Sequence, residues 1–116
     1  DIYLVKTDAR GNELWSSAIG GPASDSAAAI RQTSDSGFII AGSTASFGSG
    51  GADIYLVKTD ARGNELWSSA FGGPASDSAA AILQTSDGGF IIAGSTESFG
   101  SGGTDVYLVR TNARGE

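Results

Sequence analysis

Apolar residues in this chain occur in short runs that are separated by turn-forming residues. The four runs of one period are Asp25 to Thr33, Gly37 to Thr44, Asp53 to Asp60 and Glu65 to Phe71. Each run is rich in Ile, Val, Tyr, Phe or Ala and is bounded by Gly, Asp, Ser or Asn, which is typical of β-strands joined by tight turns. The pattern therefore predicts two antiparallel hairpins in each period and an all-β chain.

The first of these runs also fits a different element. Residues 24–33 (SDSAAAIRQT) begin with good helix N-caps and contain three alanines, so a short helix is the alternative. Such a helix would give an α+β repeat. The segment is short and a turn follows it immediately, which favours the strand.

Apolar side chains occur on both faces of the predicted strands. In the run from Asp53 to Asp60, Ile54 and Leu56 face one way, whereas Tyr55 and Val57 face the other. A sheet that is apolar on both faces must be covered on both. In a unit that repeats along the chain, the simplest cover is the next copy of the same sheet.

The chain is an internal repeat with a period of 52 residues. Residues 1–52 and 53–104 align without a gap, and residues 105–116 begin a third copy. The two full copies differ at five positions: Ile19/Phe71, Arg31/Leu83, Ser36/Gly88, Ala45/Glu97 and Ala52/Thr104. Identity at this level indicates recent duplication or deliberate construction.

Three phrases of the repeat carry a resemblance to a known family. QTSDGGFIIAGST, SFGSGGTDVYLVRT and GNELWSSAFGG resemble the Gly-rich β-propeller repeats of bacterial and archaeal surface or secreted proteins, and the resemblance covers the whole chain. It implies four-stranded blades at 25–71 and 77–112, the second completed by strand 13–19 of the same or another chain. It also implies an extracellular or cell-surface location, and these repeats carry no catalytic signature.

Blade number limits what such a chain can form. Propellers close with about four to eight blades, so two blades cannot close alone. We expect a homo-oligomeric ring of six or eight blades, made as a trimer or tetramer, or else an excerpt of a longer single-chain propeller. The predicted strands number one more than two blades require, and residues 1–8 and 105–112 would therefore compete for one position.

Composition narrows the function. The chain lacks Cys, Met and His, which removes thiolate sites and the usual proton shuttle. We therefore predict a non-catalytic structural or interaction module with no cofactor. A formal net charge of −6 disfavours nucleic acid as a partner, and no apolar run is long enough to span a membrane.

A second function class depends on a few side chains. Trp15 and Trp67 are the residues that a multivalent lectin-like propeller would stack on sugar rings, whereas packing between sheets is the alternative. Arg31 stands where the next copy has Leu83, so it changes the charge on the small-residue strand nearest the predicted axis. It would line a channel there, or else reflect drift at an exposed strand end.

Acidic residues recur at strand starts. Asp25 and Asp77 are candidate ligand residues, and together with Asp53 and Asp105 they would surround a hard cation if folding brought them together. Otherwise each bonds local amides as a turn residue. The segment GSGGADIY resembles a calcium-binding β-roll nonapeptide, but only once per period, so we predict no metal site.

Overall fold

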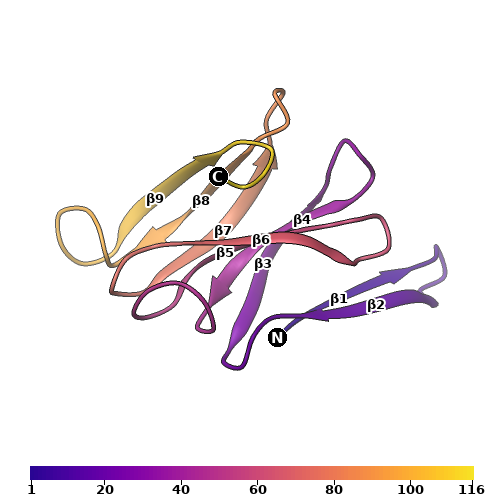
Figure 1. Cartoon of the computed structure of the whole chain (residues 1–116), viewed down its shortest axis with the longest axis horizontal. Coiled ribbons are helices and arrows are strands. Elements are labelled where there is room, and N and C mark those ends of the chain that lie inside the picture. Colours follow the sequence, from indigo (N-terminus) through magenta and orange to yellow (C-terminus); the bar gives the residue numbers. More distant parts are fainter.

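The computed structural model describes residues 1–116 and consists of nine strands joined by turns and loops (Figure 1). The strands are β1 (Ile2–Thr7), β2 (Glu13–Ile19), β3 (Asp25–Gln32), β4 (Phe38–Thr44), β5 (Asp53–Thr59), β6 (Glu65–Phe71), β7 (Asp77–Gln84), β8 (Phe90–Thr96) and β9 (Asp105–Thr111). The all-β prediction is confirmed, and the helix alternative for residues 24–33 is wrong because β3 occupies that segment. There is no helix long and apolar enough to cross a membrane.

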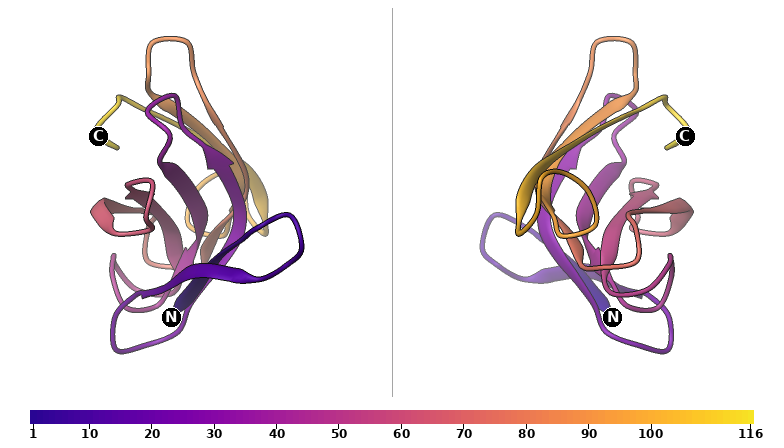
Figure 2. Two further views of the ribbon diagram at one scale, coloured as in Figure 1. Left: turned by 90° about the vertical axis from the view of Figure 1, so that its right-hand side faces the viewer. Right: turned by 90° about the vertical axis from the view of Figure 1, so that its left-hand side faces the viewer.

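The strands form three antiparallel sheets in which each strand pairs with its neighbour along the chain. β1 and β2 make a hairpin, β3 to β6 make a four-stranded sheet, and β7 to β9 make a three-stranded sheet. The two larger sheets lie against each other, and the hairpin lies against the other side of the four-stranded sheet (Figure 2). The stack does not close into a ring.

A bulge near the start of β3 explains why the repeat has a glycine at the opposite position in β4. The register between β3 and β4 shifts between Ala27 and Ala29, opposite Gly42. A Cβ at Gly42 would collide with the main-chain oxygen of Ser26, so only glycine fits. Gly94 occupies the same place opposite the bulge in β7.

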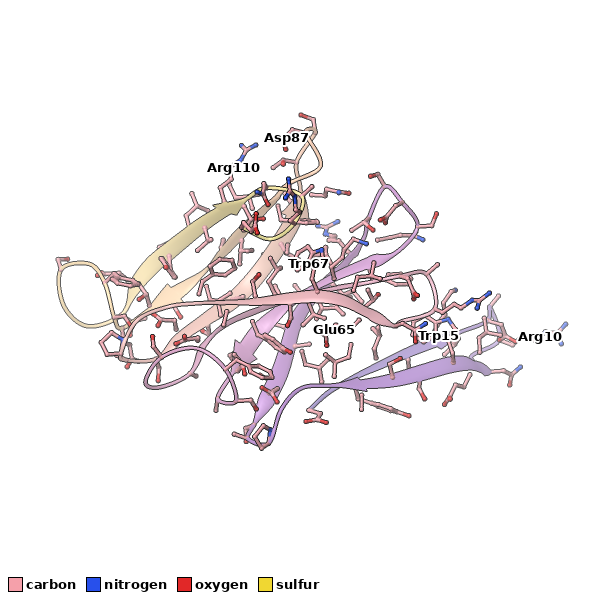
Figure 3. All side chains as sticks on the ribbon, in the orientation of Figure 1. Arg10, Trp15, Glu65, Trp67, Asp87 and Arg110 are labelled. Carbon is pink, nitrogen blue, oxygen red and sulfur yellow. The ribbon has the colours of Figure 1, made fainter.

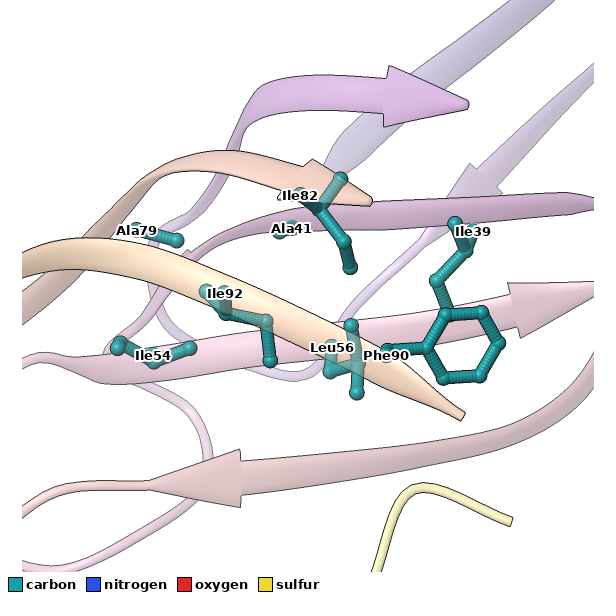
Figure 4. Packing of buried hydrophobic residues seen from close by; sticks show 8 residues of the cluster. All are labelled: Ile39, Ala41, Ile54, Leu56, Ala79, Ile82, Phe90 and Ile92. Carbon is teal, nitrogen blue, oxygen red and sulfur yellow. The ribbon is translucent and has the colours of Figure 1, made fainter. Parts of the chain in front are cut away.

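The larger core lies between the four-stranded and three-stranded sheets (Figure 4). It contains Ile39, Ala41, Ile54, Leu56, Ala79, Ile82, Phe90 and Ile92. Each fully buried large aliphatic or aromatic side chain of this kind stabilises the fold by about 1.5–3 kcal/mol. The layers are therefore held together mainly by apolar burial between repeats.

The smaller core lies between the hairpin and the four-stranded sheet. It contains Ile2, Ile19, Ile40, Tyr55 and Val57. The central sheet is thus covered on both faces, as the two-sided apolar pattern predicts.

Identical sequences have different burial in this stack. β1 and β5 both read IYLVKT after an aspartate, yet every residue of β5 is buried, whereas most of β1 is exposed or half-buried. β5 pairs with strands on both sides, and β1 pairs only with β2. Position in the array, rather than local sequence, determines burial.

Candidate functional site

Trp15 and Trp67 each pack against the layer that follows them (Figure 3). The Trp15 ring lies 6.1 Å from the Phe38 ring, centroid to centroid, and the Trp67 ring lies 6.0 Å from that of Phe90. The turn at Gly63 also lies so close to Trp15 that a Cβ there would collide with the indole. This placement is the one expected for packing between sheets, with each indole left half-buried.

Asp77 is buried in a network of hydrogen bonds at the start of β7. Its Oδ1 accepts a hydrogen bond from the hydroxyl of Thr96, and its Oδ2 accepts one from the main-chain N–H of Gly73 at 3.0 Å and one from the hydroxyl of Ser98 at 2.8 Å. Burial raises its pKa, but these donors outweigh burial and hold the pKa below its ordinary value. The carboxylate is therefore ionised and ties the β6–β7 connection to the β8–β9 loop.

Asp25 has the same arrangement one repeat earlier. It accepts hydrogen bonds from Thr44 Oγ1 at 2.5 Å, Gly21 N at 3.0 Å and Ser46 Oγ at 3.0 Å. Burial raises the pKa of Asp25 as well, but the hydrogen bonds from these three donors outweigh burial and hold the pKa below its ordinary value. Both candidate ligand carboxylates thus bond local donors, which is the alternative that the sequence left open.

Arg31 and Leu83 occupy equivalent exposed positions on β3 and β7. Arg31 lies opposite Ile39 and takes part in neither of the two ion pairs in the structure. Leu83 lies opposite Ile91. Because the stack is open, the channel role of Arg31 stays a prediction.

Two apolar surfaces are only partly covered or are left uncovered. The first, which we call the N-terminal hollow, lies between the β1–β2 hairpin and the four-stranded sheet and is lined by Leu4, Val5, Lys6, Thr7, Trp15, Ile30 and Phe38. The second, the C-terminal face, lies on the outer side of the three-stranded sheet and is lined by Ala81, Leu83, Ile91, Ala93 and Leu108. No sheet of this chain covers the C-terminal face.

The repeat relates these two surfaces to the buried interface in the middle of the molecule. Leu108 is 64% exposed, whereas its equivalent Leu56 in the preceding repeat is fully buried against the next sheet. Ile30 is 47% exposed, whereas its equivalent Ile82 is 2% exposed. The C-terminal face is therefore equivalent to one side of the interface between repeats, and Ile30 and Phe38 of the N-terminal hollow are equivalent to the other side.

The C-terminal sheet also lacks an outer strand. β5 pairs with β4 on one side and β6 on the other, but β9 pairs only with β8. The outer backbone edge of β9 therefore has free donors and acceptors for another strand.

Comparison with known proteins gives limited information. No known protein-family model matches the chain. A regulatory protein of Caulobacter vibrioides, FlaEY, is 29% identical over 129 aligned positions, which cover 93% of this chain. The chain spans only 14% of the length of that protein.

Proposed function

We propose that this chain is a non-catalytic structural module whose copies assemble head to tail into a closed β-propeller ring. Each ring would contain six or eight blades, from three or four chains. The observation that carries the proposal concerns the C-terminal face and the β3–β4 side of the N-terminal hollow. Both are partly exposed, yet by repeat equivalence they correspond to the two sides of an interface that is buried inside the chain.

Complementarity of the two surfaces supports head-to-tail contact. β1 now covers part of the N-terminal hollow. Once β1 is displaced, the C-terminal face of one chain can dock on β3 and β4 of the next, which would bury Leu108 and Ile30 as Leu56 and Ile82 are buried inside one chain. A contact between two different patches is heterologous, and it forms a ring when the rotation between neighbours closes. Apolar burial then drives assembly as it drives the packing of the sheets.

Strand pairing supports the same arrangement. The C-terminal sheet has a free edge at β9, and β2 is the strand whose repeat equivalent, β6, pairs with β5. If β2 of one chain pairs with β9 of the previous chain, the three-stranded sheet gains the fourth strand that the central sheet has. β1, the repeat equivalent of β9, is then displaced.

β9 is held in place better than β1, which favours this exchange. Arg110 of β9 lies 2.6 Å from Asp87 on the β7–β8 turn, and the ring of Tyr107 lies 5.5 Å from that of Phe99. In β1, Lys6 takes part in neither ion pair and Tyr3 is exposed. Displacing β1 therefore breaks no ion pair, whereas displacing β9 would break the one between Arg110 and Asp87.

Oligomeric mass tests the proposal. Native mass spectrometry and analytical ultracentrifugation should give three or four chains per particle. A well-behaved monomer would contradict assembly and would favour an excerpt of a longer single-chain propeller. The FlaEY match, which lies within a much longer protein, makes this alternative worth separating.

Cysteine pairs test the strand exchange separately, because the chain has no cysteine of its own. Val5 lies opposite Ser16 in the hairpin, and Val109 is the repeat equivalent of Val5. V109C combined with S16C should form disulfides between chains in the ring, whereas V5C with S16C should not crosslink there. If a ring forms in which only V5C crosslinks to S16C, the proposed assembly would stand, but the proposed exchange of β1 for β9 would be wrong.

A further inference from the structure

Asp53 contains a buried carboxylate oxygen without a partner. The residue is 2% exposed at the start of β5, and its Oδ2 accepts a hydrogen bond from the main-chain N–H of Ser49 at 2.8 Å. Its Oδ1 is fully buried and has no hydrogen-bond partner. A buried acceptor with no partner is rare in proteins and calls for a ligand that the protein atoms do not supply.

The unpartnered oxygen lies near a second buried carboxylate, that of Asp77. A Cβ built on Gly72 would lie 2.8 Å from Asp53 Oδ1 and 2.5 Å from Asp77 Oδ2. The two oxygens therefore approach the same point, and glycine at 72 leaves room for them. Asp53 belongs to the four-stranded sheet and Asp77 to the next sheet, so the pair lies at the junction between repeats.

No positive side chain balances this pair. The two ion pairs in the structure join Lys58 to Asp35 and Arg110 to Asp87, so neither cation is available. Asp77 is 1% exposed, and its carboxylate accepts hydrogen bonds only from the uncharged groups of Gly73, Thr96 and Ser98. Two buried carboxylates at close range without a cationic side chain favour a bound cation.

We infer that Asp53 and Asp77 together bind a calcium ion at the junction between the β4–β5 loop and the β6–β7 connection. Carboxylate oxygens are preferred ligands of this hard cation, whose flexible coordination accepts water and main-chain oxygens in its remaining positions. Magnesium demands a nearly ideal octahedron and fits this irregular junction less well. The ion would fasten two successive repeats to each other.

Equivalent residues in the other copies provide an internal comparison. Asp1 Oδ1 and Asp25 Oδ2 approach Gly20 in the same way, but Asp1 is exposed, so water can solvate it. The Asp53–Asp77 pair is the buried one, and its affinity for calcium should be the higher of the two.

Calorimetric titration of the EDTA-treated full chain with calcium chloride tests the inference, with magnesium chloride as the comparison. We expect calcium binding that Asp53→Asn reduces by one equivalent per chain, while Glu97→Gln, which removes the same charge from an exposed residue, leaves the number unchanged. Calcium should also raise the unfolding temperature of wild type and of E97Q more than that of D53N. Absence of binding by wild type, or equal binding by D53N and wild type, would overturn the site, whatever the stability of the variant.

Discussion

Lys58 Nζ lies 3.1 Å from Asp35 Oδ2, and this ion pair joins the C-terminal end of β5 to the β3–β4 turn. Lys58 is 6% exposed, and its ammonium also donates a hydrogen bond to the main-chain oxygen of Thr59 at 3.0 Å. Hydrogen bonds from Thr33, Gly37 and Lys58 hold the pKa of Asp35 at about 2. A nearly buried lysine thus depends on a carboxylate that is itself largely exposed.

Asp35→Asn should lower the free energy of unfolding by about 1–3 kcal/mol, because it leaves the Lys58 ammonium buried without its counter-ion. Asp87→Asn makes the same change one repeat later, where Arg110 is more than half exposed. Water can solvate that guanidinium, so the loss should be smaller. Urea denaturation of both variants measures the difference, and equal losses would contradict the role given to burial.

Stability should fall as the pH is lowered from about 4 toward 2. The folded pKa of Asp35 and of Asp87 is about 2, below the ordinary value of 3.8 for an aspartate. The unfolded chain therefore binds more protons in this range, and the stabilisation present above pH 3.8 is lost as the pH falls through the folded pKa. Urea midpoints between pH 2 and pH 6 test this, with D35N combined with D87N as the variant that should flatten the dependence.

Phe90→Ala should lower the free energy of unfolding by about 3–5 kcal/mol, since this side chain is buried in the larger core. Phe38 is its repeat equivalent but lies half-buried beside the N-terminal hollow. In the proposed ring Phe38 is covered by the neighbouring chain. Phe38→Ala should therefore cost less in dilute solution and should reduce the oligomer fraction measured by light scattering. An oligomer fraction that F38A leaves unchanged would contradict the proposed contact.

Leu108→Glu should abolish assembly while leaving the chain folded. The side chain is exposed in one chain, so the charge meets water there, but in the ring it would be buried without a partner. Leu66→Glu is the matched control, because Leu66 is also exposed and its equivalent position belongs to no interface between repeats. Sedimentation should show a monomer for L108E and an unchanged ring for L66E. Rings formed by both variants would contradict the docking surface.

Local chemistry explains why the strands could be predicted. Turns such as Ser86 to Gly89 need a residue in the left-handed region, and Gly88 has φ +86° there. Its equivalent Ser36 adopts φ +72° and is the only residue other than glycine with a positive φ. Turn residues of this kind bound the strands, so the strand positions follow from the sequence.

Burial of polar residues could not be predicted in the same way. Lys6 and Lys58 occupy identical local sequences, yet only Lys58 is buried beside an aspartate. The sequence around Asp53 is that of an ordinary aspartate at the start of a strand. Its unpartnered oxygen results from the packing of two repeats against each other. Such environments depend on neighbours that are far along the chain, and no local pattern encodes them.

The one-sided burial of the hairpin has a consequence for how the chain unfolds. Each sheet is stabilised mainly by the sheet beside it, so the β1–β2 hairpin loses only the smaller core when it detaches. Trp15 reports on that contact through Phe38, and Trp67 reports on the next one through Phe90. In variants that keep a single tryptophan, we expect the fluorescence of Trp15 to change at a lower denaturant concentration than that of Trp67. The layers of the array would then unfold one after another, starting from the hairpin.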